Sequence, residues 1–305
     1  MAWEADEKSM QPEYLKHFNG LVNERTQPQT WRKNLTGSVK MLGGGEGCDT
    51  VVFEVKYKDQ NRAVKLLKIN NDDDARSAAN ELLVCKKVSE LKKAHIFLSV
   101  LDSFLANANQ LPLQFRPALR LSLEYDESIE SVGPYFLIII MELGGPSTSQ
   151  FKYATPMQRV SVVGQLIAGL MIAERSLDLE HNDIKSLNIL LRVVNRSNKL
   201  IFTINGNDYT FKDHEIRVQL VDFGKSRINQ SDERSHDRTW HPKDLQALKF
   251  LTKRILNLPK VSKGSDQSKD ENKEFELLQK TIEECVLDHK KWVPIFRLIE
   301  KILLK

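Results

Sequence analysis

Short apolar runs follow one another along the first half of the chain, beginning near residue 38. Within several of them apolar and polar positions alternate, which is the period expected of a half-buried β-strand. The predicted strands are Val39–Leu42, Thr50–Val55, Arg62–Leu67, Leu98–Phe104 and Tyr135–Met141. The first half of the chain is therefore expected to form a β-sheet.

Apolar residues recur at three- and four-residue spacing in other parts of the chain, which is the period of an amphipathic helix. The first such stretch follows three aspartates at 72–74, which can cap a helix N-terminus. A second begins with Thr155 and Pro156, a cap and a first helical residue. Helices are predicted at about 72–91, 156–171, 242–255, 274–287 and 289–304.

These patterns together predict an α+β fold in two lobes, the first rich in β-structure and the second mainly helical. Turn residues at 144–146 end the last apolar strand, so the hinge between the lobes is placed there. The expected organisation is an N-terminal leader at 1–37, a first lobe at 38–143 and a second lobe at 144–305. The leader is polar and mixed, which favours a flexible segment or a strap packed on the domain.

One part of the second lobe departs from the helical pattern. Two β-like runs flank Asn205-Gly206, a dipeptide that favours the tight turn of a β-hairpin. We therefore expect a hairpin insertion near 200–211.

Charge and cysteine content narrow the function classes. The 45 Lys and Arg residues nearly balance 41 Asp and Glu, for a net charge of +4, so direct sequence-specific binding of nucleic acid is not expected. Cys48, Cys85 and Cys285 lack C-x-x-C spacing, which argues against a disulfide framework or zinc site and favours a reducing compartment.

The chain start lacks the features of a signal peptide, and no run approaches the roughly 18 apolar residues of a membrane span. An intracellular protein, nuclear or cytoplasmic and without a membrane partner, is expected.

The most informative motif is H-x-D-x-K-x-x-N, followed by an apolar run, at His181–Leu191. Phosphoryl transfer to a hydroxyl requires mainly that a protein position the reactants and hold divalent metal. Asp183 is the candidate to orient the acceptor hydroxyl and take its proton, and Lys185 to place positive charge on the migrating phosphoryl group. Asn188 is a candidate metal ligand through its amide oxygen. The apolar run at 189–191 predicts a strand that anchors the loop.

A D-F-G sequence follows at Asp222–Gly224, after another apolar run. Asp222 is the candidate for the second metal ligand, chelating ions that bridge nucleotide phosphates. Phe223 is expected to pack inward, and Gly224 to free the chain to turn. The position of D-F-G downstream of the first motif favours a shared metal site over a chance match.

A glycine-rich turn lies between the first two predicted strands. Its pattern, G-x-G-x-x-T-x-V, contains Gly45, Gly47 and Val52. Glycines at such a hairpin let backbone amides approach phosphate oxygens. Alone the pattern is weak, because a glycine-rich hairpin is more often only a turn.

The following strand strengthens the case for a nucleotide site. It carries Ala63 and Lys65 in the pattern A-x-K, and a lysine there can grip the α- and β-phosphates when a glutamate of the next helix holds it. Glu81 lies beside the apolar face of the next predicted helix and is the candidate partner of Lys65.

In order along the chain, the glycine-rich hairpin, A-x-K, the helix glutamate, H-x-D-x-K-x-x-N and D-F-G resemble the eukaryotic protein kinase fold over about Val39–Leu304. Within that superfamily the chain is similar to the haspin family, atypical Ser/Thr kinases that phosphorylate a histone-tail threonine. The closer resemblance is carried by Gly45–Phe53, Asn80–Leu91, Ala173–His181, the Asn205-Gly206 hairpin and His241-Pro242. The lack of A-P-E after D-F-G is a further shared feature.

This resemblance implies a bilobal protein-kinase-like fold that uses ATP and Mg2+ to phosphorylate a Ser or Thr hydroxyl of a protein substrate. A histone tail is the implied candidate substrate, with a nuclear or chromosomal location, and a monomer is expected. The kinase resemblance also implies that Met141 limits the depth of the nucleotide pocket. The hinge backbone at Glu142 and Gly144 would then bind the adenine edge.

The chain departs from the family pattern before and after the catalytic aspartate. Asn182 stands where H-R-D kinases and haspin kinases carry arginine, Lys185 replaces a haspin histidine, and D-F-G replaces the haspin D-Y-T. Without that arginine there is no obvious cation to bind a phosphate on the serines and threonine of 226–239. We therefore predict activity that is independent of phosphorylation in this segment.

Two other functions stay open. A pseudokinase scaffold would bind partners through the same fold without phosphoryl transfer, and Thr50 and Asn182, which replace a glycine and an arginine, favour it. A small-molecule kinase would share an H-x-D loop that lacks arginine. Lys185 favours a protein substrate over a small molecule.

Overall fold

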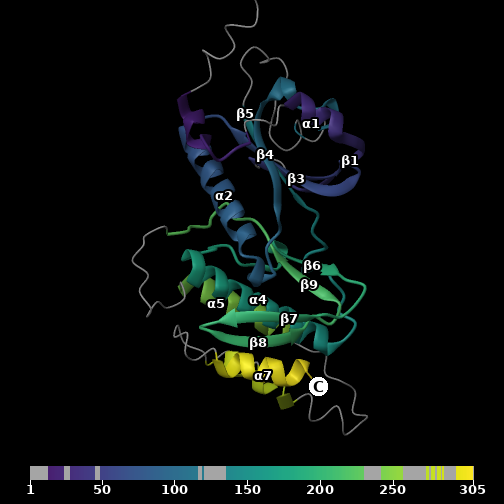
Figure 1. Ribbon diagram of the computed structural model, residues 1–305, viewed down its shortest axis with the longest axis vertical. Helices are drawn as coiled ribbons and strands as arrows, with labels where there is room; N and C mark the ends of the chain where they lie inside the picture. Colours follow the sequence, from purple (N-terminus) through teal and green to yellow (C-terminus); the bar gives the residue numbers. More distant parts are fainter. Residues whose placement is uncertain are drawn as a thin grey trace, which may run out of the picture. The chain divides into compact units, whose positions relative to one another are not determined.

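The computed structural model describes residues 13–23, 28–44, 49–115, 119, 135–229, 242–256 and 293–304, together with 273–274, 276–278, 280–282 and 284 (Figure 1). The chain divides into two compact units, Met1–Lys86 with Ser99–Leu143 and Lys87–Leu98 with Gly144–Lys305. The first unit is rich in β-structure and the later part of the chain is rich in helices. The predicted α+β class is thus confirmed.

An antiparallel sheet of five described strands lies in the first unit, in the order β1-β2-β3-β5-β4. The strands are β1 (Leu35–Gly43), β2 (Thr50–Tyr57), β3 (Gln60–Ile69), β4 (Val100–Asn107) and β5 (Tyr135–Glu142). All five overlap the predicted strands, although β4 begins two residues later than predicted. The central strands β3 and β5 are mostly buried, as their long apolar runs require.

One face of this sheet is covered by α2 (Asp72–Glu90) and η2 (Glu13–Phe18). Because side chains alternate along a strand, Leu67 and Ile69 of β3 point to this face and join a buried cluster with apolar residues of both helices. The predicted helix at 72–91 is confirmed. Its cap is Asn71, whose side-chain oxygen accepts from the Asp74 N–H at 2.9 Å.

The opposite face packs against a short helix that the sequence analysis did not predict, α1 (Pro28–Asn34). Its Trp31 is fully buried, with ring centroids 5.4 Å from Phe104 and 5.5 Å from Phe115. The neighbouring Arg32 donates to the main-chain carbonyls of residues 109–111 at 2.5–2.9 Å. Residues assigned to the leader therefore supply part of the buried core of the first unit.

The second unit is built on α4 (Pro156–Leu177), in which every residue from 160 to 173 is buried. The Thr155 side chain caps it by accepting from the Gln158 N–H at 3.3 Å, with Pro156 as the first residue. By length and mean hydropathy (1.4), this is the one helix in the described part of the chain that could cross a membrane. This differs from the expectation that no run approaches a span, but 78% of the apolar window is buried inside the structure.

Short strand pairs and two further helices surround α4 (Figure 1). They are β6 (Ile189–Val193) with β9 (Ile216–Leu220), β7 (Lys199–Ile204) with β8 (Asn207–Lys212), α5 (Pro242–Leu256) and α7 (Val293–Leu303). The predicted hairpin is confirmed, since Asn205 (φ 55°) and Gly206 (φ 75°) both adopt the positive φ of a type I′ turn. The Thr210 N–H on this hairpin donates to Glu300 of α7 at 3.0 Å.

Residues 87–98 group with the second unit, whereas the sequence analysis placed them in the first lobe. The reason is a set of contacts distant in sequence. The Leu220 N–H donates to the Ile96 carbonyl at 2.7 Å, and Phe97 forms a parallel bridge with Leu220. Ile96 also lies so close to Gly169 of α4 that a Cβ on this glycine would collide with it.

Candidate active site

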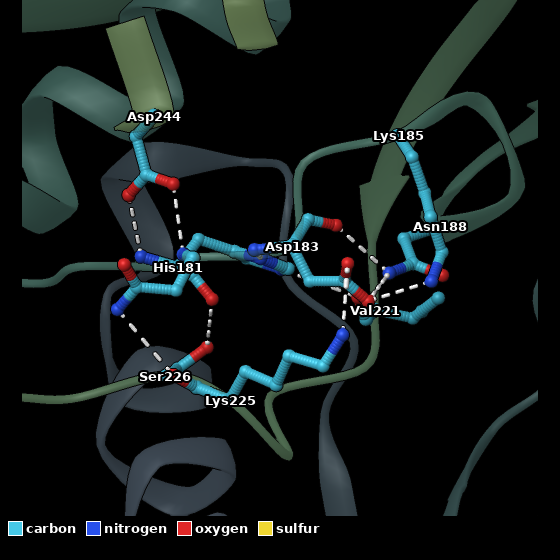
Figure 2. Close-up of polar contacts among 9 residues, drawn as sticks. His181, Asp183, Lys185, Asn188, Val221, Lys225, Ser226 and Asp244 are labelled. Carbon is cyan, nitrogen blue, oxygen red and sulfur yellow. Dashed lines mark hydrogen bonds and ion pairs between the residues drawn. The ribbon is translucent and has the colours of Figure 1, made fainter. Parts of the chain in front are cut away.

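A buried aspartate of α5 anchors the start of the loop that carries H-x-D-x-K-x-x-N. The Asp244 carboxylate accepts the main-chain N–H of His181 at 2.6 Å and of Asn182 at 2.8 Å (Figure 2). Asp244 lies in the first turn of α5, where the helix dipole favours a carboxylate. Asn182 has a φ of 61°, in the left-handed region that asparagine tolerates. These two bonds fix the loop just before Asp183.

The imidazole of His181 is buried and bonded on both nitrogens. Nδ1 accepts from the Asp183 N–H at 3.3 Å, and Nε2 lies 3.3 Å from the Val221 carbonyl (Figure 2). An acceptor at Nδ1 and a donor at Nε2 assign the neutral tautomer. Burial lowers the pKa of His181, and this outweighs the opposing effect of Asp244 and other nearby carboxylates. A buried, neutral ring with both nitrogens in use is suited to supporting the loop rather than to acting as a base.

Three side chains converge on the Asp183 carboxylate (Figure 2). Lys185 Nζ donates to Oδ2 at 2.6 Å, Asn188 Nδ2 donates to the same oxygen at 3.2 Å, and Lys225 Nζ lies 3.4 Å from Oδ1. Burial opposes ionisation of Asp183, but the two lysines together outweigh it and lower the pKa of the carboxyl group. Asp183 is thus an anion at neutral pH. A weakly basic carboxylate of this kind is suited mainly to orienting a hydroxyl.

The residues next to this loop fit a magnesium ion. Asn188 is buried, and its amide nitrogen also donates to the Asp183 carbonyl at 2.9 Å, so its amide oxygen is the atom that a cation would use. The Val221 N–H donates to the Asn188 carbonyl at 3.0 Å, which brings Asp222 next to the loop. Mg2+ commonly uses one or two protein oxygens together with substrate phosphates and water. One amide oxygen and one carboxylate match that pattern.

In the first unit, Lys65 of β3 and Glu81 of α2 form a hydrogen-bonded ion pair. Both side chains are almost fully buried, with 9% and 4% of their surface exposed. The structure thus brings together the lysine and the helix glutamate that the sequence analysis paired. A buried pair of this kind needs a good geometry to offset the loss of hydration of both charges.

Strand register places three other predicted residues of this unit on the face of Lys65. Val52 of β2 pairs with Lys65, and Ala63 of β3 pairs with Met141 of β5. Directly paired residues of antiparallel strands point to the same face of a sheet. One face of the sheet therefore carries Val52, Ala63, Lys65 and Met141. The helix α2, which contains Glu81, covers the same face. Apolar side chains beside one ammonium group are a suitable surface for a nucleotide base and its phosphates.

Two other residues predicted to bind the nucleotide, Glu142 and Gly144, do not lie on this face of the sheet. Glu142 is the last residue of β5, and its N–H donates to the Ser99 carbonyl at 3.2 Å. Gly144 belongs to the second unit, where a Cβ would collide with the Leu190 side chain. Gly45 and Gly47 lie outside the described residues.

Sequence reasoning missed two residues that touch the loop at 181–188, Asp244 and Lys225. The only local signal for Asp244 was its place just after Pro242, which the sequence analysis used to start a helix. Lys225 directly follows D-F-G, and nothing in its spacing distinguishes it from a solvated lysine. Both act through contacts with residues more than forty positions away.

The fold and the loop at 181–188 define a protein-kinase-like domain. A model of the haspin-like kinase domain matches residues 7–247, which is most of the chain. The chain belongs to the haspin-like kinase family, and the predicted family is confirmed.

Curated relatives match over shorter stretches. The chain is 33% identical to mouse Ser/Thr-protein kinase haspin over 99 residues, and 32% identical to an Arabidopsis thaliana haspin homologue over 94 residues. Each match covers 31% of this chain, but only 13% of the mouse protein and 16% of the plant protein. An uncharacterised Caenorhabditis elegans protein is 25% identical over 225 residues, covering 73% of this chain and 70% of that protein.

Proposed function

We propose that this chain is an ATP- and Mg2+-dependent Ser/Thr protein kinase of the haspin type. The observation that carries the proposal is the ionised Asp183 carboxylate, bonded to Lys185 and Asn188 in a loop that Asp244 anchors. Phosphoryl transfer depends mainly on such positioning and on charge stabilisation. The relatives named as Ser/Thr-protein kinases support the choice of acceptor.

The residues divide into three roles. The acceptor hydroxyl donates to Asp183, its oxygen forms a bond to the γ-phosphorus of ATP as the bond to ADP breaks, and its proton passes to Asp183. Lys185 stabilises the charge of the migrating group. Asn188 and Asp222 would hold Mg2+, which would neutralise phosphate charge when bound. Nucleotide binding is assigned to Gly45, Gly47, Val52, Ala63, Lys65, Glu81, Met141, Glu142 and Gly144.

Radiolabelled phosphate transfer by the wild type and by Asp183→Asn tests the proposal. The substitution replaces the carboxylate by a neutral amide, which cannot take the proton of the substrate hydroxyl. It is expected to lower kcat by at least about 100-fold. Asp208→Asn, an exposed aspartate on the β7–β8 hairpin, is the matched control and should keep its activity. Equal incorporation by the wild type and Asp183→Asn would instead support the pseudokinase scaffold. Chelation of Mg2+ should abolish phosphate transfer by the wild type and by Asp208→Asn.

A histone-tail threonine is the substrate that we propose on the strength of the family resemblance. A peptide array that includes histone tails, set beside a panel of small-molecule alcohols, compares the two acceptor classes. Phosphorylation of peptides only is the expected result. Phosphorylation of small molecules only would favour the small-molecule kinase.

We also propose that the protein acts as a monomer and, as a haspin-type kinase, in the nucleus. Light scattering after size exclusion measures its mass against the 35.1 kDa of the chain. Microscopy of the tagged full chain in interphase and mitotic cells tests the location.

A further inference from the structure

A short segment of the second unit, residues 144–148, lies alongside β6. The Thr148 N–H donates to the Ile189 carbonyl at 2.8 Å, and a second main-chain bond of 2.8 Å joins the segment to Leu191. An antiparallel bridge lies between these two bonds. Because β9 also pairs with β6, this strand has hydrogen-bonded neighbours on both of its edges. The segment is thus held against the strand that directly follows Asn188.

A glycine allows the segment to approach so closely. A Cβ on Gly145 would overlap the Leu191 carbonyl, which belongs to the backbone and cannot move aside as a side chain can. The Gly145 N–H also donates to Oε1 of Gln219, a buried residue of β9, at 3.2 Å. Contacts with both β6 and β9 therefore fix the backbone that carries Thr148.

Thr148 forms hydrogen bonds on both sides of Asn188, the candidate metal ligand. Its hydroxyl donates to the Ser186 carbonyl at 2.9 Å, and Ser186 begins the turn η7 that ends at Asn188. Its N–H donates to the carbonyl of Ile189, the residue after that turn. One residue therefore holds the backbone just before and just after Asn188.

The position of this backbone matters for the amide oxygen of Asn188. Its amide nitrogen is engaged by the Asp183 carboxylate and carbonyl, so the oxygen can be moved mainly by a shift of the turn itself (Figure 2). Mg2+ requires a nearly octahedral set of oxygens at about 2.0–2.1 Å and tolerates little displacement of a ligand. A turn that loses its bond to the Thr148 hydroxyl should therefore bind the ion more weakly.

We propose that the Thr148 hydroxyl is a positioning group, which sets the affinity of the site for Mg2+ by holding Asn188 through the Ser186 carbonyl. The inference rests on the proposed function, because that function makes Asn188 a metal ligand. Thr148 lies outside the H-x-D-x-K-x-x-N and D-F-G motifs, and its local sequence does not indicate this role.

Binding of Mn2+ to the full chain tests the proposal without a need for catalysis. Mn2+ takes the same kinds of oxygen ligand as Mg2+, and electron paramagnetic resonance detects it in the presence of a non-hydrolysable ATP analogue. Thr148→Val removes the hydroxyl but keeps the branched shape, whereas Thr148→Ser keeps the hydroxyl. The matched control is Thr203→Val, the same change at a half-buried position of β7.

Thr148→Val should raise the dissociation constant for Mn2+ by about fivefold, the size expected from the loss of one hydrogen bond. Thr148→Ser and the control should bind Mn2+ as the wild type does. Equal affinity of the wild type and Thr148→Val would overturn the proposal. A Thr148→Ser variant that binds as weakly as Thr148→Val would also overturn it, because the hydroxyl would then not be the cause.

The magnesium dependence of phosphate transfer gives a second measurement. Thr148→Val should raise the Mg2+ concentration for the half-maximal rate by about fivefold, and excess Mg2+ should recover most of the lost rate. A rate that is lowered by the same factor at every Mg2+ concentration would contradict the proposal, since misfolding has that effect.

The two measurements separate this inference from the proposed function. If the wild type transfers no phosphate, the kinase proposal fails, but weaker Mn2+ binding by Thr148→Val and its recovery in Thr148→Ser would still support the role of Thr148. If the wild type and nucleotide analogue together bind no Mn2+, the role of Thr148 is overturned as well.

Discussion

Two buried carboxylates of this protein are stabilised in different ways. Glu81 of the first unit, 3% exposed, bonds to the ammonium group of Lys65. Asp244 of the second unit, 5% exposed, accepts two main-chain N–H groups from residues 181 and 182. The first carboxylate is matched with a charge, whereas the second is matched with backbone donors.

The difference indicates different roles. Backbone donors fix the shape of a loop, so Asp244 is a structural anchor next to Asp183. A buried ion pair is a poor source of stability, because both charges lose their hydration. Retention of Lys65 and Glu81 in the core of a sheet is better explained by the proposed nucleotide site, in which the ammonium group meets phosphate. Breaking each contact should therefore have different consequences.

The largest effect is expected from separating the ion pair. Lys65→Met leaves Glu81 buried without its bonded cation and should lower the free energy of unfolding by about 3–5 kcal/mol. Lys65→Met combined with Glu81→Leu should recover most of this loss, because both charges are removed. Urea unfolding measures the stability, and titration calorimetry with Mg-ATP should show no binding in either variant.

Lys40→Met is the control for this series. Lys40 of β1 lies 3.8 Å from Glu54, and its side chain is 74% exposed. Such a pair is worth less than about 1 kcal/mol. A double variant that is no more stable than Lys65→Met would contradict the account of the pair as unfavourable to stability.

A somewhat smaller effect is expected at Asp244. Asp244→Asn keeps one acceptor oxygen for two N–H groups and should cost about 2 kcal/mol of stability, the usual range for an unmet buried donor. Hydrogen exchange of the His181 and Asn182 amides should accelerate, and kcat should fall while nucleotide binding is kept. Unchanged exchange at these two amides would show that the carboxylate does not hold the loop.

The pH dependence of stability should reflect His181. Its folded-state pKa is lowered by burial, so below about pH 6.5 the unfolded chain binds a proton that the folded chain does not. Stability should therefore fall as the pH drops from 7 to 5. Urea unfolding across this range measures the slope, and NMR titration of the ring checks its origin. A ring that titrates near 6.5 in the folded protein would rule His181 out.

The smallest effect is expected from phosphatase treatment. Asn182 donates to the Lys225 carbonyl, and the buried Ser226 hydroxyl, 1% exposed, bonds to the His181 carbonyl. A phosphate on Ser226 would thus disrupt the loop rather than activate it. Kinase activity should change by less than about twofold, within the effect of a surface contact. Loss of activity after dephosphorylation would contradict the prediction. The other serines and the threonine of this segment, at 231–239, lie outside the described residues.

The sequence by itself determined the features that are local in the chain. Alternating apolar residues located the strands of the first unit, and Asn205-Gly206 located the hairpin, because strand period and turn conformation depend on neighbouring residues. The H-x-D-x-K-x-x-N and D-F-G motifs identified the family for the same reason, since their residue order is itself the signal. The pairing of Lys65 with Glu81 followed from a strand and a helix that are close in sequence.

Only the tertiary structure decided the contacts between distant segments. Asp244 accepts a hydrogen bond from the His181 amide, which is 63 residues away in the sequence. Lys225 contacts Asp183, which is 42 residues away. Trp31 enters the core beside Phe104 although its segment has no strong periodic pattern. Which carboxylate meets which amide, and which ring fills which space, depends on how separate elements pack. How two elements pack depends on the shapes of the surfaces that they present after folding. The spacing of residues within one segment does not determine it.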